Sequence, residues 1–124
     1  MAKTEKRKKS TKLPKQLERA LRAAEDKQAT NMVVLDLEKA AGFTDFFLIC
    51  SGGNPRQIRA IADAIVEALA EKGVKPAYLE GYDRSEWVLL DYFDFVVHVF
   101  APETRMFYDL ERLWGNAERV EIAP

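Results

Sequence analysis

The sequence has very few of the residues that support metal, disulfide or thiol chemistry. Cys50 and His98 are its single cysteine and its single histidine. One cysteine cannot form an internal disulfide, and a structural zinc site needs about four Cys or His ligands. Both residues stand inside apolar runs, whereas a reactive thiol needs an exposed, electropositive setting. We therefore expect no catalytic residue, no metal and no cofactor.

Long hydrophobic runs are also missing. No apolar stretch approaches the roughly 20 residues of a membrane span, and the N-terminus lacks the apolar segment of a secretory signal. The 124 residues suit a single domain with one core. We therefore expect a cytoplasmic protein that makes no membrane contact.

The net charge of −1 conceals an uneven distribution. Seven cationic residues against one glutamate give residues 1–15 a net charge of +6, so the rest of the chain carries −7. Residues 1–12 contain almost no apolar side chains, and we expect them to form a disordered basic arm. Such an arm could bind RNA phosphates in a salt-dependent way, or it could serve only as a solubilising tail. The candidate RNA contacts are Lys6, Arg7, Lys8 and Lys9.

Glycine is scarce, yet two glycines occur together in the stretch 51–65, SGGNPRQIRAIADAI. Asn54 is a typical helix N-cap, Pro55 suits the first helical position, and Gln57 can reach back to the cap. A phosphate-binding loop of the Walker type would need Gly-Lys-Ser or Gly-Lys-Thr, and a dinucleotide loop would need three spaced glycines. The stretch therefore predicts a capped helix that ends before Gly73, with anion binding by free N–H groups as the alternative.

Hydrophobic periodicity predicts an α/β fold with the element order αββαβββα. We expect a single small domain over residues 13–116 and a C-terminal tail over 117–124. A mixed five-stranded sheet would carry three helices. The expected strands are residues 32–37, 46–50, 77–81, 86–91 and 95–100, and the other helices are residues 13–26 and a last one from Pro102 to just before Gly115.

The strand 86–91 indicates where a partner could bind. Side chains alternate along a strand, so Trp87 and Leu89 point to one face and Val88 and Leu90 to the other, and both sets are apolar. A hairpin turn at residues 92–93 would place Trp87 opposite His98 and Leu89 opposite Val96. Three short helices would leave part of one face open for docking. The alternative is that a helix covers this patch.

Three segments together resemble the ribosomal silencing factor family, also called RsfS or Iojap-like. They are TDFFLICSGGNPRQIRAIADAI, EWVLLDYFDFVVHVF and TRMFYDLERLWG, and the resemblance covers residues 17–115. It implies an α/β fold similar to nucleotidyltransferases, without enzymatic activity. It also implies binding to the large ribosomal subunit through ribosomal protein L-fourteen, which obstructs joining of the small subunit and lowers translation when nutrients are scarce.

The motif residues of the family can be matched to individual residues of this sequence. The family's Asp-Trp pair falls on Glu86 and Trp87, so the acid is longer by one methylene group. Its aspartate after the strand is Asp91, and its Val-His-Val includes His98. Phe93 stands where the family commonly has glycine, which suggests a different turn or an added apolar contact. The expected partner-binding residues are Tyr82, Glu86, Trp87, Leu89, Asp91 and His98.

Three further interpretations are compatible with the sequence. The apolar patch or an exposed strand could support a homodimer of the free protein. A nucleotidyltransferase-like enzyme would use residues 51–53 to hold a triphosphate, but no Asp-x-Asp follows to hold magnesium. A general nucleic-acid-binding module would rely on the arm, but the acidic body lacks the basic face of such domains.

Overall fold

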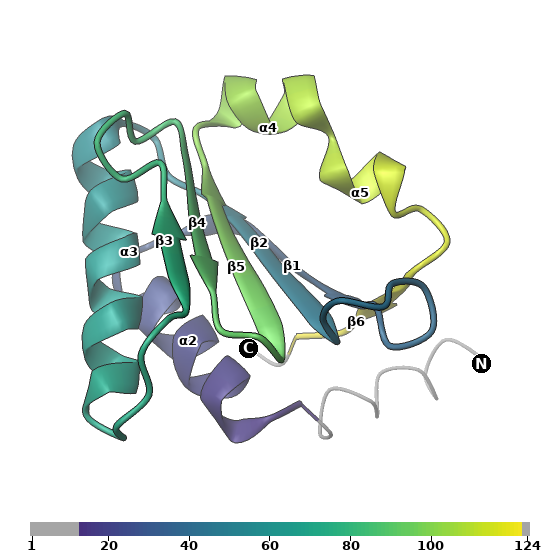
Figure 1. The fold of residues 1–124 in the computed structure, drawn as a ribbon. Coiled ribbons are helices and arrows are strands. Elements are labelled where there is room, and N and C mark those ends of the chain that lie inside the picture. The colour runs from purple at the N-terminus through teal and green to yellow at the C-terminus, as the bar shows by residue number, and fades with distance from the viewer. Residues whose placement is uncertain (1–12, 123–124) are drawn as a thin grey trace.

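The computed structural model describes residues 13–122. The predicted basic arm, with Lys6, Arg7, Lys8 and Lys9, lies outside the described residues. In the described part, a mixed sheet forms the centre of the protein and helices lie on both of its sides (Figure 1). The predicted α/β class is therefore confirmed.

The sheet has six strands in the order β3-β4-β5-β2-β1-β6. β2 and β5 are parallel neighbours, and every other neighbouring pair is antiparallel. The central strands β2 and β5 are buried along their whole length, as expected for strands with packed layers on both faces. The strands are β1 (Thr30–Asp36), β2 (Phe46–Ser51), β3 (Tyr78–Glu80), β4 (Trp87–Asp91), β5 (Phe95–Phe100) and β6 (Glu118–Val120).

Two long helices, α2 (Lys15–Asp26) and α3 (Pro55–Ala70), cover one face of the sheet (Figure 1). Ile58, Ile61, Ile65 and Leu69 of α3 have no exposed surface, and burial of each contributes about 1.5–3 kcal/mol. They pack with the side chains of β4 and β5 that point to the same face, such as Val88. This layer contains the larger of the two hydrophobic clusters.

The start of α3 confirms the predicted capping. The Asn54 side chain accepts a hydrogen bond from the Gln57 backbone N–H at 2.9 Å, and Pro55 is the first helical residue. Gln57 Oε1 in turn accepts from the Gly53 N–H at 2.6 Å. A Cβ at Gly52 would lie 2.9 Å from the Ile58 side chain, so close packing of the loop on the helix explains this glycine.

The β4–β5 hairpin has a register two residues away from the predicted one. Trp87 is opposite Phe100, and Leu89 is opposite His98, so the predicted pairs of Trp87 with His98 and Leu89 with Val96 were wrong. The two turn residues are Phe93 and Asp94, one position later than expected. A shift of one residue at the turn moves the pairing by two, which leaves every side chain on its predicted face.

Phe93 adopts a φ of +71° at the first turn residue, where a two-residue hairpin of this kind usually has glycine. Its N–H donates to Asp91 Oδ1 at 2.9 Å, and its carbonyl accepts from the Thr44 hydroxyl at 2.8 Å. The aromatic side chain is 70% exposed. Hydrogen bonds with Asp91 and Thr44 therefore hold a conformation that Phe93 does not itself favour.

The C-terminal region differs most from the prediction. The expected last helix is broken at Asp109, whose φ is +48°, into α4 (Pro102–Tyr108) and α5 (Leu110–Leu113). β6 pairs with β1 inside the segment expected as a tail, so the prediction of five strands was wrong by one. Three residues are too short for an alternating pattern to be recognised in the sequence.

Candidate docking face

The second face of the sheet is only partly covered, and we call it the open face. It consists of the side chains that alternate away from α2 and α3. α4 buries none of its residues, and only Leu110 and Trp114 of the α5 region pack on the cluster beneath. The open face comprises Val33, Leu35, Phe47, Ile49, Ser51, Tyr78, Glu80, Trp87, Leu89, Asp91, Val96, His98, Phe100 and Arg119.

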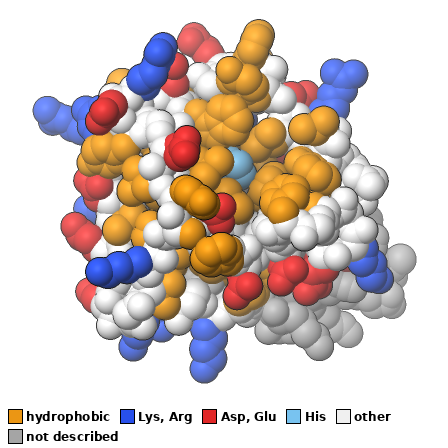
Figure 2. Space-filling view, viewed as in Figure 1, with side chains coloured by type: hydrophobic (Ala, Val, Ile, Leu, Met, Phe, Trp, Pro, Cys, Tyr) orange, Lys and Arg blue, Asp and Glu red, His pale blue; other side chains and the backbone are white. Residues whose placement is uncertain are grey.

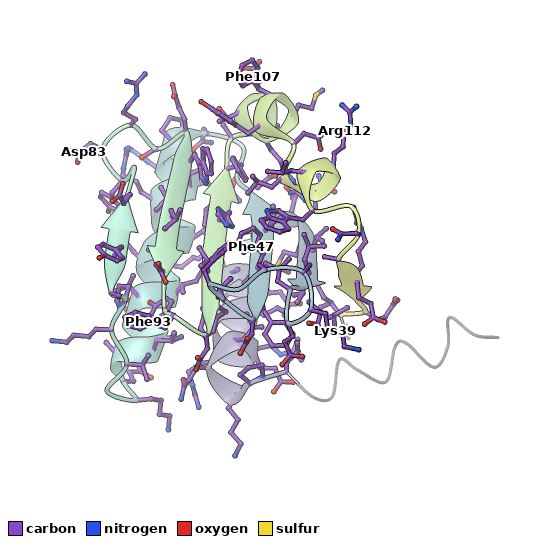
Figure 3. The ribbon with its side chains drawn as sticks, turned by 45° about the vertical axis from the view of Figure 1, so that its right-hand side comes forward. Lys39, Phe47, Asp83, Phe93, Phe107 and Arg112 are labelled. Atoms are coloured by element: carbon purple, nitrogen blue, oxygen red, sulfur yellow. The ribbon has the colours of Figure 1, made fainter. Side chains whose placement is uncertain are left out.

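Hydrophobic side chains dominate this surface. Figure 2 shows them gathered around the chain's one histidine, with acidic side chains among them. Around the rim, large apolar side chains are exposed to solvent at Phe43, Tyr78, Phe93, Phe107 and Leu113. In Figure 3, Phe47 lies near the middle of the sheet, Phe93 at the hairpin end and Phe107 at the outer side of α4. An apolar surface of this kind typically marks an interaction site.

Trp87 links the sheet to α4. Its indole Nε1–H donates to His98 Nδ1 at 3.0 Å. Its ring lies 4.9 Å from the Phe100 ring and 4.8 Å from the Tyr108 ring, measured between centroids. Trp87 is half-buried, so one part of the indole is fixed by these neighbours while the rest stays accessible. A preorganised aromatic of this type loses little conformational entropy on binding.

A second aromatic group continues the surface toward β1 and α5. The Phe47 ring lies 4.4 Å from the His98 ring and 6.2 Å from the Trp114 ring, in edge-to-face geometry in both cases. Phe43 completes the group, with its ring 6.0 Å from Trp114. Pairs in such orientations contribute about 0.5–1.5 kcal/mol beyond their buried area. The face is therefore a rigid aromatic platform.

His98 lies at the base of this platform and is 3% exposed. Burial lowers the pKa of His98 to about 3, because the charged imidazolium would lose its hydration among apolar neighbours. The ring is therefore neutral at physiological pH. Its Nδ1 accepts the Trp87 bond, whereas Nε2 is buried and has no hydrogen-bond partner.

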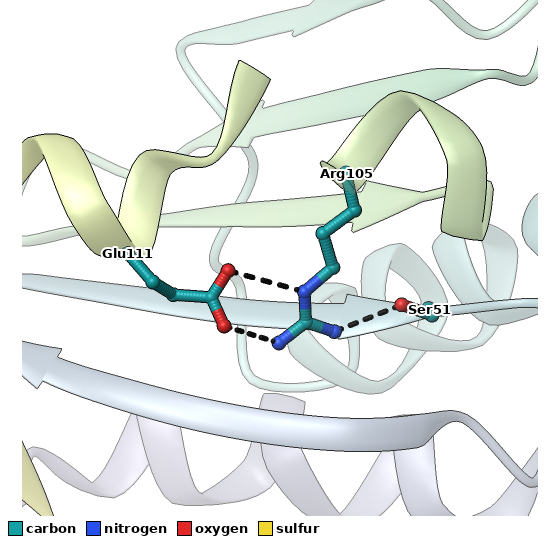
Figure 4. A network of polar contacts seen from close by, with 3 residues as sticks. All are labelled: Ser51, Arg105 and Glu111. Atoms are coloured by element: carbon teal, nitrogen blue, oxygen red, sulfur yellow. Dashed lines mark hydrogen bonds and ion pairs between the residues drawn. The ribbon is translucent and has the colours of Figure 1, made fainter. Parts of the chain in front are cut away.

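Arg105 holds the α4–α5 segment in place. Its guanidinium donates from Nε and Nη2 to the two carboxylate oxygens of Glu111, at 3.3 and 2.8 Å, and from Nη1 to Ser51 Oγ at 2.8 Å (Figure 4). The hydrogen bond from Arg105 lowers the pKa of Glu111. This bidentate contact spans the break at Asp109 and ties both helices to the end of β2. Tyr108, whose ring contacts Trp87, lies in the segment between Arg105 and Glu111.

The charges of the open face differ between its two sides, because Arg119 of β6 lies beside Leu35 whereas the opposite side is acidic. Glu80 and Asp91 belong to the part of the face formed by β3, β4 and β5, which carries no lysine or arginine. A hollow of about 840 Å³ at the β1–β2 loop is also acidic, since five carboxylates and one lysine line it. The charge of Asp36 raises the pKa of Glu38 there. The lining carboxylates are Asp36, Glu38, Asp45, Asp94 and Glu118.

Four of the six predicted contact residues share the open face: Trp87, Leu89, Asp91 and His98. Glu86 precedes the strand, is exposed, and forms an ion pair with Arg84 at 3.7 Å. Tyr82 lies elsewhere. Its hydroxyl donates to Asp63 of α3 at 2.9 Å, and its ring packs with the helix-covered cluster. The structure therefore places Tyr82 away from the other predicted contacts.

Sequence reasoning did not single out Phe47, Phe100 or Tyr108 as candidate contacts. Alternation along the strand 95–100 placed Phe100 on the same side as His98, but the face of Phe47 could not be assigned, because its strand is apolar on both sides. Nothing in the sequence around Tyr108 indicated that its ring would contact Trp87. The alternation around Phe47 could have suggested its face only if the neighbouring strand and register had been known.

The loop at residues 51–53 is accounted for by its own contacts. The Gly52 N–H donates to the Phe100 carbonyl at 3.0 Å, and the Gly53 N–H donates to Gln57. Burial raises the pKa of the Cys50 thiol to about 12, which makes it unreactive. Within residues 13–122, no group of three or more Cys, His, Asp or Glu is arranged to hold a metal ion. No helix of that part is long and apolar enough to cross a membrane.

Known proteins resemble the chain over most of its length. The family profile described as "Ribosomal silencing factor during starvation" matches residues 10–124. The ribosomal silencing factor RsfS of Halalkalibacterium halodurans is 42% identical over 106 residues, covering 86% of this chain and 91% of the relative. RsfS of Bacillus subtilis is 41% identical over 103 residues, covering 83% and 87%.

A solved structure agrees with these relatives. A crystal structure from Bacillus halodurans superimposes with a TM-score of 0.77 at 40% identity, covering 86% of this chain and 96% of the other. The family profile, the relatives and the fold lead to one conclusion. The chain belongs to the ribosomal silencing factor (RsfS) family.

Proposed function

We propose that this protein binds the large ribosomal subunit through ribosomal protein L-fourteen and obstructs joining of the small subunit, which lowers translation when nutrients are scarce. It acts in the cytoplasm, without catalysis and without a cofactor. The observation that carries the proposal is the open face, an aromatic platform that the chain's own helices cover only in part, so that Trp87 and Leu89 remain partly accessible. Membership of the silencing factor family supplies the ribosomal context.

The contacts of the open face suit a protein partner. Trp87 is half-buried and fixed by Phe100, Tyr108 and His98, and such anchored aromatics often dominate binding energy. The carboxylates of Glu80 and Asp91 belong to the same face. A basic protein surface would be attracted and oriented by these charges, because complementary potentials speed encounter and set the register of docking.

The basic arm would add a second contact. We propose that Lys6, Arg7, Lys8 and Lys9 reach ribosomal RNA near the docked domain and bind its phosphates. The arm carries positive charge while the rest of the chain is acidic, so the two parts suit different partners. RNA binding of this kind weakens steeply with salt.

A homodimer is a further proposal for the free protein. The same open face would be shared between two copies, so dimerisation would compete with ribosome binding. Sedimentation over a range of protein concentrations tests this, and Trp87→Ala should shift the equilibrium toward monomer. A single monomeric species at every concentration would reject it.

The main test is co-sedimentation with isolated large and small ribosomal subunits, followed by a subunit-joining assay. We expect binding to the large subunit alone and inhibition of joining. Trp87→Ala should weaken binding by about 2 kcal/mol, or roughly thirtyfold. Leu79→Ala is the matched control, because Leu79 is also exposed and apolar but pairs with Leu90 on the opposite face.

Two results would count against the proposal. Binding to neither subunit would remove the ribosomal function itself. Binding that is unaffected by Trp87→Ala in a folded variant, but weakened by Leu79→Ala, would move the contact to the helix-covered side of the sheet.

A further inference from the structure

His98 has an unused hydrogen-bond donor at the centre of the open face. The imidazole is neutral, and its Nδ1 accepts from the Trp87 indole N–H at 3.0 Å. Nδ1 therefore carries no hydrogen, and the ring proton must be on Nε2. That atom is buried and has no partner. A buried donor left unpaired is costly, and native structures rarely contain one without a reason.

The position of His98 points to docking. The residue is flanked on the open face by Leu89, its cross-strand neighbour, and by Phe47, whose ring is 4.4 Å away. Leu89 is only partly buried, so the imidazole borders the accessible part of the face. Nε2 itself is buried, so a docking partner would reach it only after a flanking side chain moves aside.

We propose that His98 is a specificity-determining residue, whose Nε2–H donates a hydrogen bond to a neutral carbonyl or amide oxygen that a docking protein inserts into the open face. Trp87 sets this role by holding the imidazole in the Nε2–H tautomer. The inference rests on the proposed function, because the docking protein is taken to be part of the large ribosomal subunit.

The surroundings define the chemistry of the acceptor. A carboxylate or phosphate would have to shed its water among Leu89, Phe47 and Trp87, and it would be repelled by Asp91 on the same face. A neutral oxygen avoids both penalties. RNA, whose accessible surface is dominated by phosphates, is disfavoured at this face for the same reason. The fitting partner is a protein segment with apolar side chains around one free carbonyl group.

Two substitutions of His98 test the roles of its two ring nitrogen atoms separately. In His98→Asn, the side-chain oxygen occupies the place of Nδ1 and can still accept from Trp87, but the donor at Nε2 is lost. In His98→Gln, an amide donor reaches the place of Nε2, while the acceptor for Trp87 is lost. Circular dichroism and thermal unfolding of the full-length variants establish that each is folded.

Binding to isolated large ribosomal subunits is then measured for the wild type and both variants. We expect His98→Asn to bind about tenfold more weakly or worse, because the partner's oxygen is left unpaired, and His98→Gln to stay within about threefold. Equal loss in both variants would show only a packing role and overturn the inference. Unchanged binding by folded His98→Asn would also overturn it, while leaving the proposed function intact.

A second measurement gives its main result on the wild type alone, without any variant. Long-range ¹H–¹⁵N spectra of the free wild-type protein report which imidazole nitrogen carries the proton. We expect the Nε2–H tautomer alone, and a mixture of tautomers in Trp87→Phe. A predominance of the Nδ1–H tautomer in the wild type would refute the mechanism. If the wild type binds neither ribosomal subunit, the proposed function and this inference fail together.

Discussion

The burial of His98 predicts a specific dependence of stability on pH. Burial lowers the pKa of His98 to about 3, compared with an ordinary value of 6.5. An unfolded chain therefore takes up a proton near pH 6.5 that the folded protein does not accept until the pH is far lower. Because the folded pKa is depressed, the stabilisation is fully present above pH 6.5. It is lost as the pH falls from 6.5 toward 3.

The size of the effect follows from the linkage relation. Between pH 6.5 and pH 3 the unfolded state binds one proton more than the folded state. The free energy of unfolding therefore falls by about 1.4 kcal/mol for each pH unit of acidification. Between pH 7 and pH 5 the loss due to His98 is about 2 kcal/mol. For a domain whose total stability is about 5–15 kcal/mol, this is a large fraction.

Urea unfolding at pH 5, 6, 7 and 8 measures the effect in the wild type and in His98→Gln. The chain has one histidine, so the variant has none, and contributions from carboxylates cancel in the comparison. The wild type should lose about 2 kcal/mol more than the variant between pH 7 and pH 5. Parallel curves would mean that the imidazole ionises normally in the folded protein, which would refute the reasoning from burial.

Three other perturbations follow from the structure. Phe93→Gly should raise the free energy of unfolding by about 0.5–1 kcal/mol, because glycine tolerates the positive φ; chemical denaturation checks this, and a destabilised variant would contradict it. Arg105→Ala should lower stability by about 2–3 kcal/mol, because Glu111 and Ser51 lose their partner; Arg112→Ala on the exposed side of α5 is the control, and equal effects would exclude the bidentate contact as the cause. Deletion of residues 1–12 should weaken binding to the large subunit and flatten its salt dependence; identical affinity and salt slope would remove the arm from the interface.

Much of the fold was predictable because its signals are local. Asn54, Pro55 and Gly73 set the ends of α3 through capping and backbone preference, and these depend on neighbours within a few residues. The alternation of Trp87 and Leu89 against Val88 and Leu90 gave the correct faces of β4. Four of the six predicted contact residues share one face for the same reason.

The remaining features depend on residues far apart in the sequence. The predicted hairpin register was wrong by two residues because the turn lies at Phe93 and Asp94, where Phe93 adopts a positive φ that its residue type does not suggest. Thr44, from another loop, donates a hydrogen bond to the Phe93 carbonyl in this turn. The break at Asp109 coincides with the contact of Arg105 with Ser51, 54 positions away. Tyr82 was expected at the partner surface, but Asp63 of α3 provides its hydrogen-bond partner on the other side.

The sequence by itself determined the class of fold, the boundaries of the long helices, the family, and the face to which each β4 side chain points. It could do so because capping, alternation and chain breaks act over a few residues. Only the tertiary structure decided which apolar face stays partly uncovered, that Phe47, Tyr108 and Trp114 join Trp87 there, and that His98 keeps one donor unused. Those outcomes depend on register and packing between strands and helices that are distant in the chain.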